Sequence, residues 1–494
     1  MIAARKLLRR ALQSAPLAAL LLAATPLAQG PLGGGAHGPG GWPTQPGTPF
    51  TWAENPASLG PVRAQTGNVG SWTVFSNEFQ FRWVPSYSGD PTFEVILFPP
   101  ISGHPTKLER FLVQFPMGVP PGGPEQKGLI LGFHPFGVSE KSVFQGTTLP
   151  YICALRKWIL VAPYGQTDTN FGCVDSQVAL DAVLRFVDLF LDWNQDRIYT
   201  VGFSMGGLNA VSYAMRHLQD PDNGMRVAGV ICHTGTMDVV AEYWSGTQQL
   251  QNLLQDDFHF YGPPNTHLFN YERITPYRLK AGAVNPNKAS VRNLAHIPFY
   301  LHVNLDDPNT DLVAQNLVLR DFLVSEGVTV NAHSVNAGNQ HSWSTLPMAD
   351  AILWIEQFTL ANNEPQSGVL FMDRPTRYLG TELLSPESPS EVAFLEYSTD
   401  TSMNQVDVTD TRVVERLALD LPEMRVDTSI TFGVAHSSAD DTPVELVLRG
   451  LTQAPSSVLA NGTPTLNYSY DGRLGELTIT PSPLGAYTLL QFLP

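Results

Sequence analysis

The chain has 494 residues, more than one ordinary domain needs, and this length favours roughly three structural units. Hydrophobic residues make up 43% of the chain and charged residues 15%, a composition that can bury sizeable cores and excludes the disordered class. The formal net charge of -16 argues against a nucleic-acid partner, because phosphate binding relies on lysine and arginine.

Residues 1–28 have the layout of a signal peptide. Basic residues gather in the first ten positions, and an apolar run from Ala15 to Leu27 then leads to the small residue Ala28. This run is short and is interrupted by Pro16 and Pro26, so it does not read as a membrane span. We therefore expect a secreted or periplasmic protein without stable membrane insertion.

Two further segments precede the main domain. Residues 29–50 are rich in glycine and proline, cannot bury much apolar surface, and are interpreted as a linker. Within residues 51–107, the segments Ser71–Phe75 and Phe93–Phe98 are rich in β-branched and aromatic residues. They predict a small N-terminal β region.

Residues 108–365 alternate short apolar runs with longer helical stretches, which is typical of a parallel sheet with crossover helices. We expect a doubly wound, mostly parallel α/β sheet. Its strands are expected at 128–133, 158–162, 198–203, 227–231, 299–303 and 329–333. Helices are expected at 176–193, 208–218, 312–325 and 348–360.

Two regions depart from this alternation. Residues 239–295 are aromatic and polar, and we interpret them as an insertion that is either a lid over the active site or a solvent-facing segment. From residue 366 to 494 the chain is rich in Pro, Ser, Thr and Asp and contains several extended apolar runs. These predict a separate C-terminal β domain, whose role is either binding or purely structural.

The most specific motif is Gly202-Phe-Ser204-Met-Gly206, placed directly after an apolar strand and directly before a helix. This is the G-x-S-x-G nucleophile elbow in the context that it requires. A serine on such a tight turn needs small neighbours, and the helix N-terminus beside it favours developing negative charge. Ser204 is therefore the candidate nucleophile.

A serine hydroxyl needs a base, and the base needs an acid; in this fold both come later in the chain, acid first. His341 lies in a glycine-containing loop one strand after the acidic segment and is the expected base, ahead of His333, which lies within a strand pattern. Asp306 is the preferred acid, with Asp307 and Asp311 as alternatives.

Acyl transfer also needs two backbone N–H groups directed at the oxyanion. The first is expected from Met205, directly after the nucleophile. The second is expected from the loop after the first parallel strand, His134-Pro-Phe136-Gly137. Proline has no N–H, so Phe136 is the candidate donor.

On these motifs, residues 108–360 resemble the α/β-hydrolase superfamily, near its polyhydroxybutyrate depolymerase, feruloyl esterase and prolyl-oligopeptidase-like branches. The resemblance is carried by residues 196–207, 302–307 and 340–343. It implies Ser204, Asp306 and His341 as a catalytic triad that transfers an acyl group to water. Members usually have His-Gly in the oxyanion loop, whereas this chain has His134-Pro135.

The favoured function is a serine hydrolase of carboxylic esters, with a polyester or plant-wall ester as candidate substrates. The alternatives are a prolyl-oligopeptidase-like serine peptidase and a non-catalytic binding module on a hydrolase fold. No cofactor or metal is expected, because the chain has neither H-E-x-x-H nor a close cluster of histidine and carboxylate residues.

Overall fold

The protein is described by a computed structural model. The described residues are 37–38, 42–43, 69–74, 77–84, 86–90, 92–97, 107–114, 128–190, 193–218, 226–256, 258–260, 262–280, 282–360, 367–378, 380–386, 390–437, 443–465, 468–479 and 488–493. The predicted signal peptide, 1–28, lies outside them, as does most of the predicted linker, 29–50. Within that linker, β1 (His37–Gly38) and β2 (Trp42–Pro43) form an antiparallel pair.

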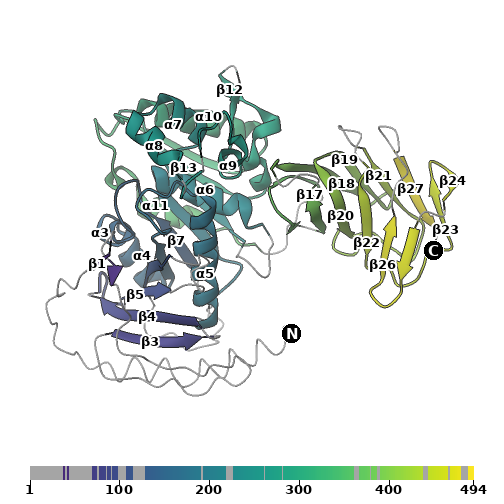
Figure 1. Cartoon of the computed structure of the whole chain (residues 1–494), viewed down its shortest axis with the longest axis horizontal. Coiled ribbons are helices and arrows are strands. Elements are labelled where there is room, and N and C mark those ends of the chain that lie inside the picture. Colours follow the sequence, from purple (N-terminus) through teal and green to yellow (C-terminus); the bar gives the residue numbers. More distant parts are fainter. Residues whose placement is uncertain are drawn as a thin grey trace.

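A ten-stranded sheet organises the larger part of the molecule (Figure 1). Six of its strands run parallel, in the order β8-β7-β9-β10-β13-β14, and they coincide with the six apolar runs of the sequence. Their bounds are β7 (Leu129–Phe133), β8 (Ile159–Pro163), β9 (Ile198–Phe203), β10 (Gly229–His233), β13 (Phe299–Asn304) and β14 (Val330–Val335). Strand β9 is buried along its whole length, which explains why its sequence is a continuous apolar run.

The N-terminal strands, which the sequence predicted as a small β region, extend this same sheet. They are β3 (Val69–Val74), β4 (Asn77–Val84), β5 (Thr92–Leu97) and β6 (Glu109–Gln114). Each pairs antiparallel with its neighbour, and β6 pairs antiparallel with β8. The physical reason is that the edge of β8 offers unpaired backbone groups, which an added strand satisfies.

Helices cover both faces of the sheet. One face packs against α3 (Lys141–Gln145), α4 (Leu149–Arg156) and α11 (Met348–Ile355), which share a hydrophobic cluster with it. The other face packs against α5 (Val174–Phe190), α6 (Met205–Arg216) and α10 (Thr310–Ser325). This mostly parallel sheet, with helices on both sides and a serine at the turn from β9 into α6, is the α/β-hydrolase fold.

In the described residues of the predicted insertion, 239–256, 258–260, 262–280 and 282–295, there are three short helices and two 3₁₀ turns. The helices are α7 (Val239–Ser245), α8 (Gln248–Leu254) and α9 (Leu268–Glu272). Their apolar side chains form a hydrophobic cluster separate from the two clusters of the main sheet, and Met205 and Leu208 from the first turns of α6 belong to it. The insertion therefore packs beside the end of α6 that follows Ser204.

The C-terminal part folds into two β-sheets, which lie to one side of the α/β part (Figure 1). One sheet has the order β15-β18-β19-β21-β27-β23-β24 and the other β16-β17-β20-β22-β26-β25. These strands are β15 (Ser367–Met372), β16 (Thr376–Tyr378), β17 (Thr381–Pro386), β18 (Ala393–Asp400), β19 (Gln405–Arg412), β20 (Val414–Asp420), β21 (Phe432–His436), β22 (Glu445–Arg449), β23 (Ser457–Ala460), β24 (Thr463–Pro464), β25 (Tyr468–Asp471), β26 (Glu476–Ile479) and β27 (Thr488–Leu493). Apolar side chains of both sheets share one buried cluster.

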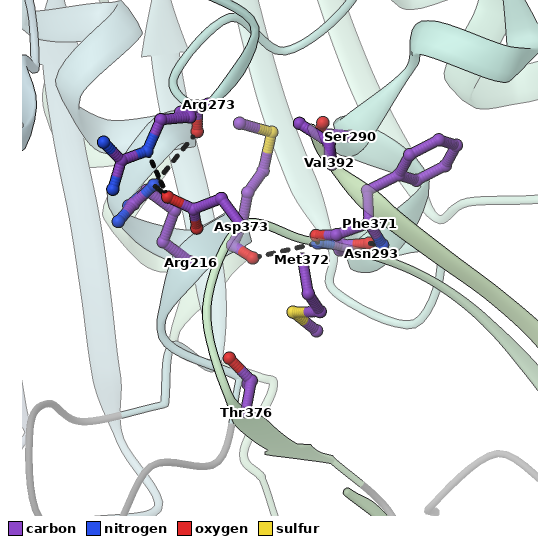
Figure 2. A pocket seen from close by; sticks show the side chains of 10 residues that line it. Arg216, Arg273, Ser290, Asn293, Phe371, Met372, Asp373, Thr376 and Val392 are labelled. Atoms are coloured by element: carbon purple, nitrogen blue, oxygen red, sulfur yellow. Dashed lines mark hydrogen bonds and ion pairs between the residues drawn. The ribbon is translucent and has the colours of Figure 1, made fainter. Parts of the chain in front are cut away.

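A buried ion pair joins the two parts at the start of the β domain (Figure 2). Asp373 Oδ2 lies 2.7 Å from Arg216 Nη1, at the end of α6, and 2.5 Å from Arg273 Nε. Burial raises the pKa of Asp373, but the two guanidinium groups outweigh it and hold this pKa well below its usual value. Beside the pair, Asn293 exchanges two hydrogen bonds with the backbone of Phe371. The joint is therefore polar and, apart from the partly exposed Arg273 side chain, buried.

Candidate active site

Ser204 occupies a strained turn between β9 and α6. Its φ of 57° and ψ of -124° lie in a region that side-chain-bearing residues rarely adopt. The flanking glycines make this turn feasible, because a Cβ on Gly202 would lie 1.8 Å from the Gly206 carbonyl oxygen. A Cβ on Gly206 would lie 2.2 Å from the Phe133 carbonyl oxygen. The two glycines of the motif are thus required by close backbone approach.

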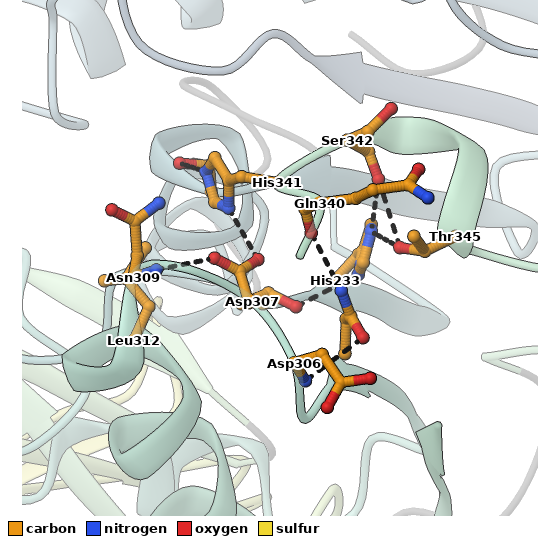
Figure 3. Close-up of polar contacts among 12 residues, drawn as sticks. His233, Asp306, Asp307, Asn309, Leu312, Gln340, His341, Ser342 and Thr345 are labelled. Atoms are coloured by element: carbon orange, nitrogen blue, oxygen red, sulfur yellow. Dashed lines mark hydrogen bonds and ion pairs between the residues drawn. The ribbon is translucent and has the colours of Figure 1, made fainter. Parts of the chain in front are cut away.

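His341 connects Ser204 to a buried carboxylate. Its Nε2 lies 2.8 Å from Ser204 Oγ, and its Nδ1 lies 2.7 Å from Asp307 Oδ2 (Figure 3). A carboxylate only accepts, so the ring proton belongs on Nδ1 and Nε2 is left to accept from the serine hydroxyl. The Asp307 side chain is fully buried, whereas the His341 side chain is 23% exposed. The carboxylate end of the arrangement is therefore buried, whereas the imidazole is partly exposed to solvent.

The acid expected from the sequence was Asp306, and the structure corrects this to its neighbour Asp307. Asp306 turns away from the imidazole and accepts hydrogen bonds from Asn336 Nδ2 (2.9 Å) and from Gly338 N (3.1 Å). Asp307 turns inward, and its second carboxylate oxygen accepts from Asn309 N (2.9 Å). The third candidate, Asp311, is exposed in the first turn of α10. Successive residues after the end of β13 point in different directions, which their order in the sequence does not specify.

The loop that carries His341 is held by Asn304, the last residue of β13. Asn304 Nδ2 donates to the carbonyl oxygens of Gly338 (3.0 Å) and Gln340 (2.8 Å), and its Oδ1 accepts from Ala337 N (3.0 Å). The asparagine is fully buried. No sequence signal pointed to this residue, because its partners lie more than 30 positions later in the chain.

His233, at the end of β10, supports the same loop from the other side. Its Nε2 lies 3.0 Å from the Ser342 carbonyl oxygen and 2.9 Å from Thr345 Oγ1 (Figure 3). The Phe203 ring stacks on His233 and also contacts His341, at centroid distances of 4.7 and 4.4 Å. Burial lowers the pKa of His233 to about 4, so this ring is neutral near pH 7. Sequence reasoning left this histidine among those without a role.

His333, the weaker candidate for the base, lies on β14 beside His302 of β13. It is exposed on β14 and stacks on Tyr300 at a centroid distance of 4.9 Å.

The two residues predicted to donate to an oxyanion belong to α6 and to the loop after β7. Met205 is the first residue of α6, where backbone N–H groups have no partner inside the helix. A Cβ on Gly206 would also lie 2.8 Å from the His134 carbonyl oxygen. The loop that follows β7 therefore begins next to the N-terminal end of α6. Gly137 N is already bonded to the Asp168 carbonyl oxygen at 2.8 Å. Met205 and Phe136 thus remain the predicted donors.

In the part of the chain that the structure describes, no group of three or more His, Cys, Asp or Glu side chains is placed to hold a metal ion. Among the same residues, no helix is long and apolar enough to cross a membrane. The three cysteines, Cys153, Cys173 and Cys232, are buried and unpaired.

Comparison with known proteins gives structural neighbours only. No protein-family model matches the chain, and no curated protein matches its sequence. A fluorophosphonate-binding serine hydrolase of Staphylococcus aureus is 12% identical, with 53% of this chain and 97% of that chain covered and a TM-score of 0.38. An S-formylglutathione hydrolase of Agrobacterium tumefaciens is 12% identical, with 56% and 97% covered and a TM-score of 0.40. An acylaminoacyl peptidase of Pyrococcus horikoshii is 12% identical, with 60% and 50% covered and a TM-score of 0.37.

Fold and site together define a class. The sheet order, the strained serine between β9 and α6, and the hydrogen-bonded chain from Ser204 through His341 to Asp307 are those of an α/β-hydrolase of the serine-dependent type.

Proposed function

We propose that this protein hydrolyses carboxylic esters through an acyl-enzyme formed on Ser204. The observation that carries the proposal is the continuous hydrogen-bonded chain of Ser204, His341 and Asp307, with distances of 2.8 and 2.7 Å. A serine becomes a useful nucleophile only when a base accepts its proton as it attacks, and His341 Nε2 is within reach of that proton.

Each residue has a defined part in the proposed reaction. Ser204 Oγ attacks the ester carbonyl carbon while His341 Nε2 takes the hydroxyl proton. Asp307 stabilises the resulting imidazolium and fixes the ring orientation. His341 then gives this proton to the leaving alkoxide, and the acyl group stays on Ser204. Water then attacks the acyl carbon while His341 Nε2 takes a proton from it. His341 gives this proton to Ser204 Oγ as the bond between the acyl group and the serine breaks, which releases the acid and restores the serine.

The negative charge that develops on the carbonyl oxygen needs donors that are already in place. We assign these to the backbone N–H groups of Met205 and Phe136. Loss of one such donor typically costs about 3 kcal/mol of barrier.

We further propose that the enzyme acts outside the cytoplasm on an extracellular ester, with polyesters and plant-wall esters as the first candidates. The support for export is the basic and apolar pattern of residues 1–28. The acidic composition suits a soluble exported protein.

The test uses mature protein and two substrate panels, short-chain p-nitrophenyl esters and peptide p-nitroanilides. Each panel is repeated with Ser204→Ala, and folding of the variant is checked by circular dichroism. We expect ester turnover that falls by several orders of magnitude in the variant. Equal turnover by Ser204→Ala would refute the assignment. Cleavage of p-nitroanilides alone would indicate a peptidase, and silence of the wild type on both panels would favour a binding role.

A further inference from the structure

A buried glutamate side chain outside the triad holds the turn on which the predicted oxyanion loop rests. Glu109, the first residue of β6, is fully buried. Its Oε1 accepts from the backbone N–H groups of Tyr164 (3.2 Å) and Gly165 (3.0 Å), and its Oε2 accepts from Gln166 N (2.8 Å). Three consecutive amides therefore converge on one side chain.

These amides belong to a turn with an unfavourable backbone. Gly165 and Gln166 both have left-handed conformations, with φ of +66° and 67°. Such a conformation is easy for glycine but costs a residue with a side chain about 1 kcal/mol or more. Two left-handed residues in succession point their N–H groups to one side, and Glu109 is the acceptor on that side. The Glu109 side chain thus compensates for the strain of the turn.

The same turn is bonded to the loop after β7. His134, itself buried, has its Nε2 2.9 Å from the Tyr164 carbonyl oxygen and its Nδ1 2.9 Å from the Pro135 carbonyl oxygen. Gly137 N donates to the Asp168 carbonyl oxygen at 2.8 Å. The contacts with Tyr164 and Asp168 bracket Phe136, whose N–H is one of the proposed oxyanion donors. The position of that donor therefore depends on the position of residues 164–168.

A further contact ties the turn to the nucleophile helix. Asn170 Nδ2 donates to the Tyr164 carbonyl oxygen (3.2 Å), and Asn170 Oδ1 accepts from Asn209 Nδ2 of α6 (2.8 Å). The turn is thus connected both to the helix that begins after Ser204 and to the loop that faces it.

Burial favours the uncharged acid form of Glu109, so its bonds to the turn amides do not require a charged carboxylate. Burial raises its pKa to about 8, and Glu140 nearby acts in the same direction, while the three amides oppose this. The adjacent Arg110 pairs with Glu140 (3.1 Å), and its guanidinium lies over the Tyr164 ring (4.0 Å). Arg110 thus forms its ion pair with Glu140, whereas Glu109 accepts hydrogen bonds from the backbone of residues 164–166.

We propose that Glu109 is a positioning residue for ester hydrolysis: by fixing the 164–168 turn, it sets the place of the His134–Gly137 loop and so of the Phe136 N–H that receives the oxyanion. This inference rests on the proposed serine-hydrolase function. It predicts that loss of Glu109 weakens binding of the tetrahedral state more than binding of the ground-state ester.

The experiment compares Glu109→Gln with a matched control on the same strand. Gln114→Met is the control, because Gln114 is equally buried but bonds to the Pro150 carbonyl oxygen, away from the turn. Two quantities are measured on p-nitrophenyl esters, kcat and KM. A third is the inhibition constant of an alkyl trifluoromethyl ketone, which forms a tetrahedral adduct with an active serine.

For Glu109→Gln we expect kcat to fall about ten- to a hundredfold with little change in KM, and the inhibition constant to rise in parallel. Gln114→Met is expected to lower the melting temperature while leaving all three quantities near wild type. If Glu109→Gln lowers the melting temperature as the control does, without changing kcat or the inhibition constant, the inference is wrong.

A second variant tests the same link from its other end. His134→Gln is expected to show the same kinetic change, and the double variant is expected to lose little more than either single one, because both substitutions break one connection. Fully additive losses would overturn the inference.

If Glu109→Gln does not fold, His134→Gln decides alone, and an unchanged kcat and inhibition constant would reject the inference. Residual turnover by Ser204→Ala would instead count against the proposed function itself.

Discussion

His341 Nδ1 lies 2.7 Å from Asp307 Oδ2, and this carboxylate is fully buried beneath the ring. Asp306, one residue earlier, has its carboxylate in the neighbouring loop, bonded to Asn336 and Gly338. Two adjacent acidic residues therefore have separable roles: one orients the imidazole, and the other shapes the loop that carries it.

This separation predicts unequal effects of the same substitution. Asp307→Asn keeps one acceptor oxygen, which can accept from Asn309 N–H, so its NH2 group faces His341 and favours the wrong ring tautomer. We therefore expect kcat to fall about 10³- to 10⁴-fold. Asp306→Asn keeps an acceptor oxygen for the loop, so its kcat is expected to stay within about tenfold of wild type. Steady-state kinetics on a p-nitrophenyl ester would measure both. A larger loss in Asp306→Asn than in Asp307→Asn would contradict the correction.

The buried His233 predicts a pH dependence of stability. Burial lowers its pKa from 6.5 to about 4, so between these values the unfolded chain binds a proton that the folded protein does not. This contribution to stability is complete above pH 6.5 and is lost as the pH falls through about 4. The slope from this one group is at most about 1.4 kcal/mol per pH unit.

The check is urea unfolding at several pH values between 7 and 4 for wild type and His233→Gln. We expect the free energy of unfolding of the wild type to fall more steeply toward acid than that of the variant. His296, whose pKa burial lowers to about 3, does not depend on His233 and contributes equally to both proteins. Identical slopes would show that His233 does not titrate in this way.

The ion pair between the two parts predicts a stability effect without a catalytic one. Asp373→Asn would leave Arg216, whose side chain is 5% exposed, without its buried counter-charge. Breaking a buried pair in this way typically costs about 3 kcal/mol or more. The exposed pair of Arg416 and Glu445 supplies the control, because Arg416→Gln is expected to cost about 1 kcal/mol or less.

Thermal unfolding and ester turnover, measured on the same preparations, would check this prediction. Turnover by folded Asp373→Asn is expected to match that of wild type, since Asp373 contacts none of Ser204, His341 and Asp307. Equal melting temperatures for Asp373→Asn and Arg416→Gln would contradict a stabilising joint.

The sequence was informative where one local pattern determines the structure. The six parallel strands follow from apolar runs at regular spacing, and the turn at Ser204 follows from glycines that alone fit its close contacts. Asp307 could not be separated from Asp306, because side-chain direction after a strand end depends on the loop that it meets. Asn304, His233 and Glu109 were missed for a related reason, since each acts on backbone groups that are distant in the sequence. The joining of the N-terminal strands to the main sheet likewise depends on a free edge that only the folded molecule has.

Helix α6 has Ser204 directly before its first residue and Arg216 as its last. The helix therefore begins at the nucleophile, and its last residue forms an ion pair with Asp373 at the start of the β domain. We therefore expect the hydrolase part cut off at residue 365 to be less stable than the whole chain. Such a protein would lose the Asp373 carboxylate that Arg216 and Arg273 share, and the Phe371 backbone groups that bond to Asn293.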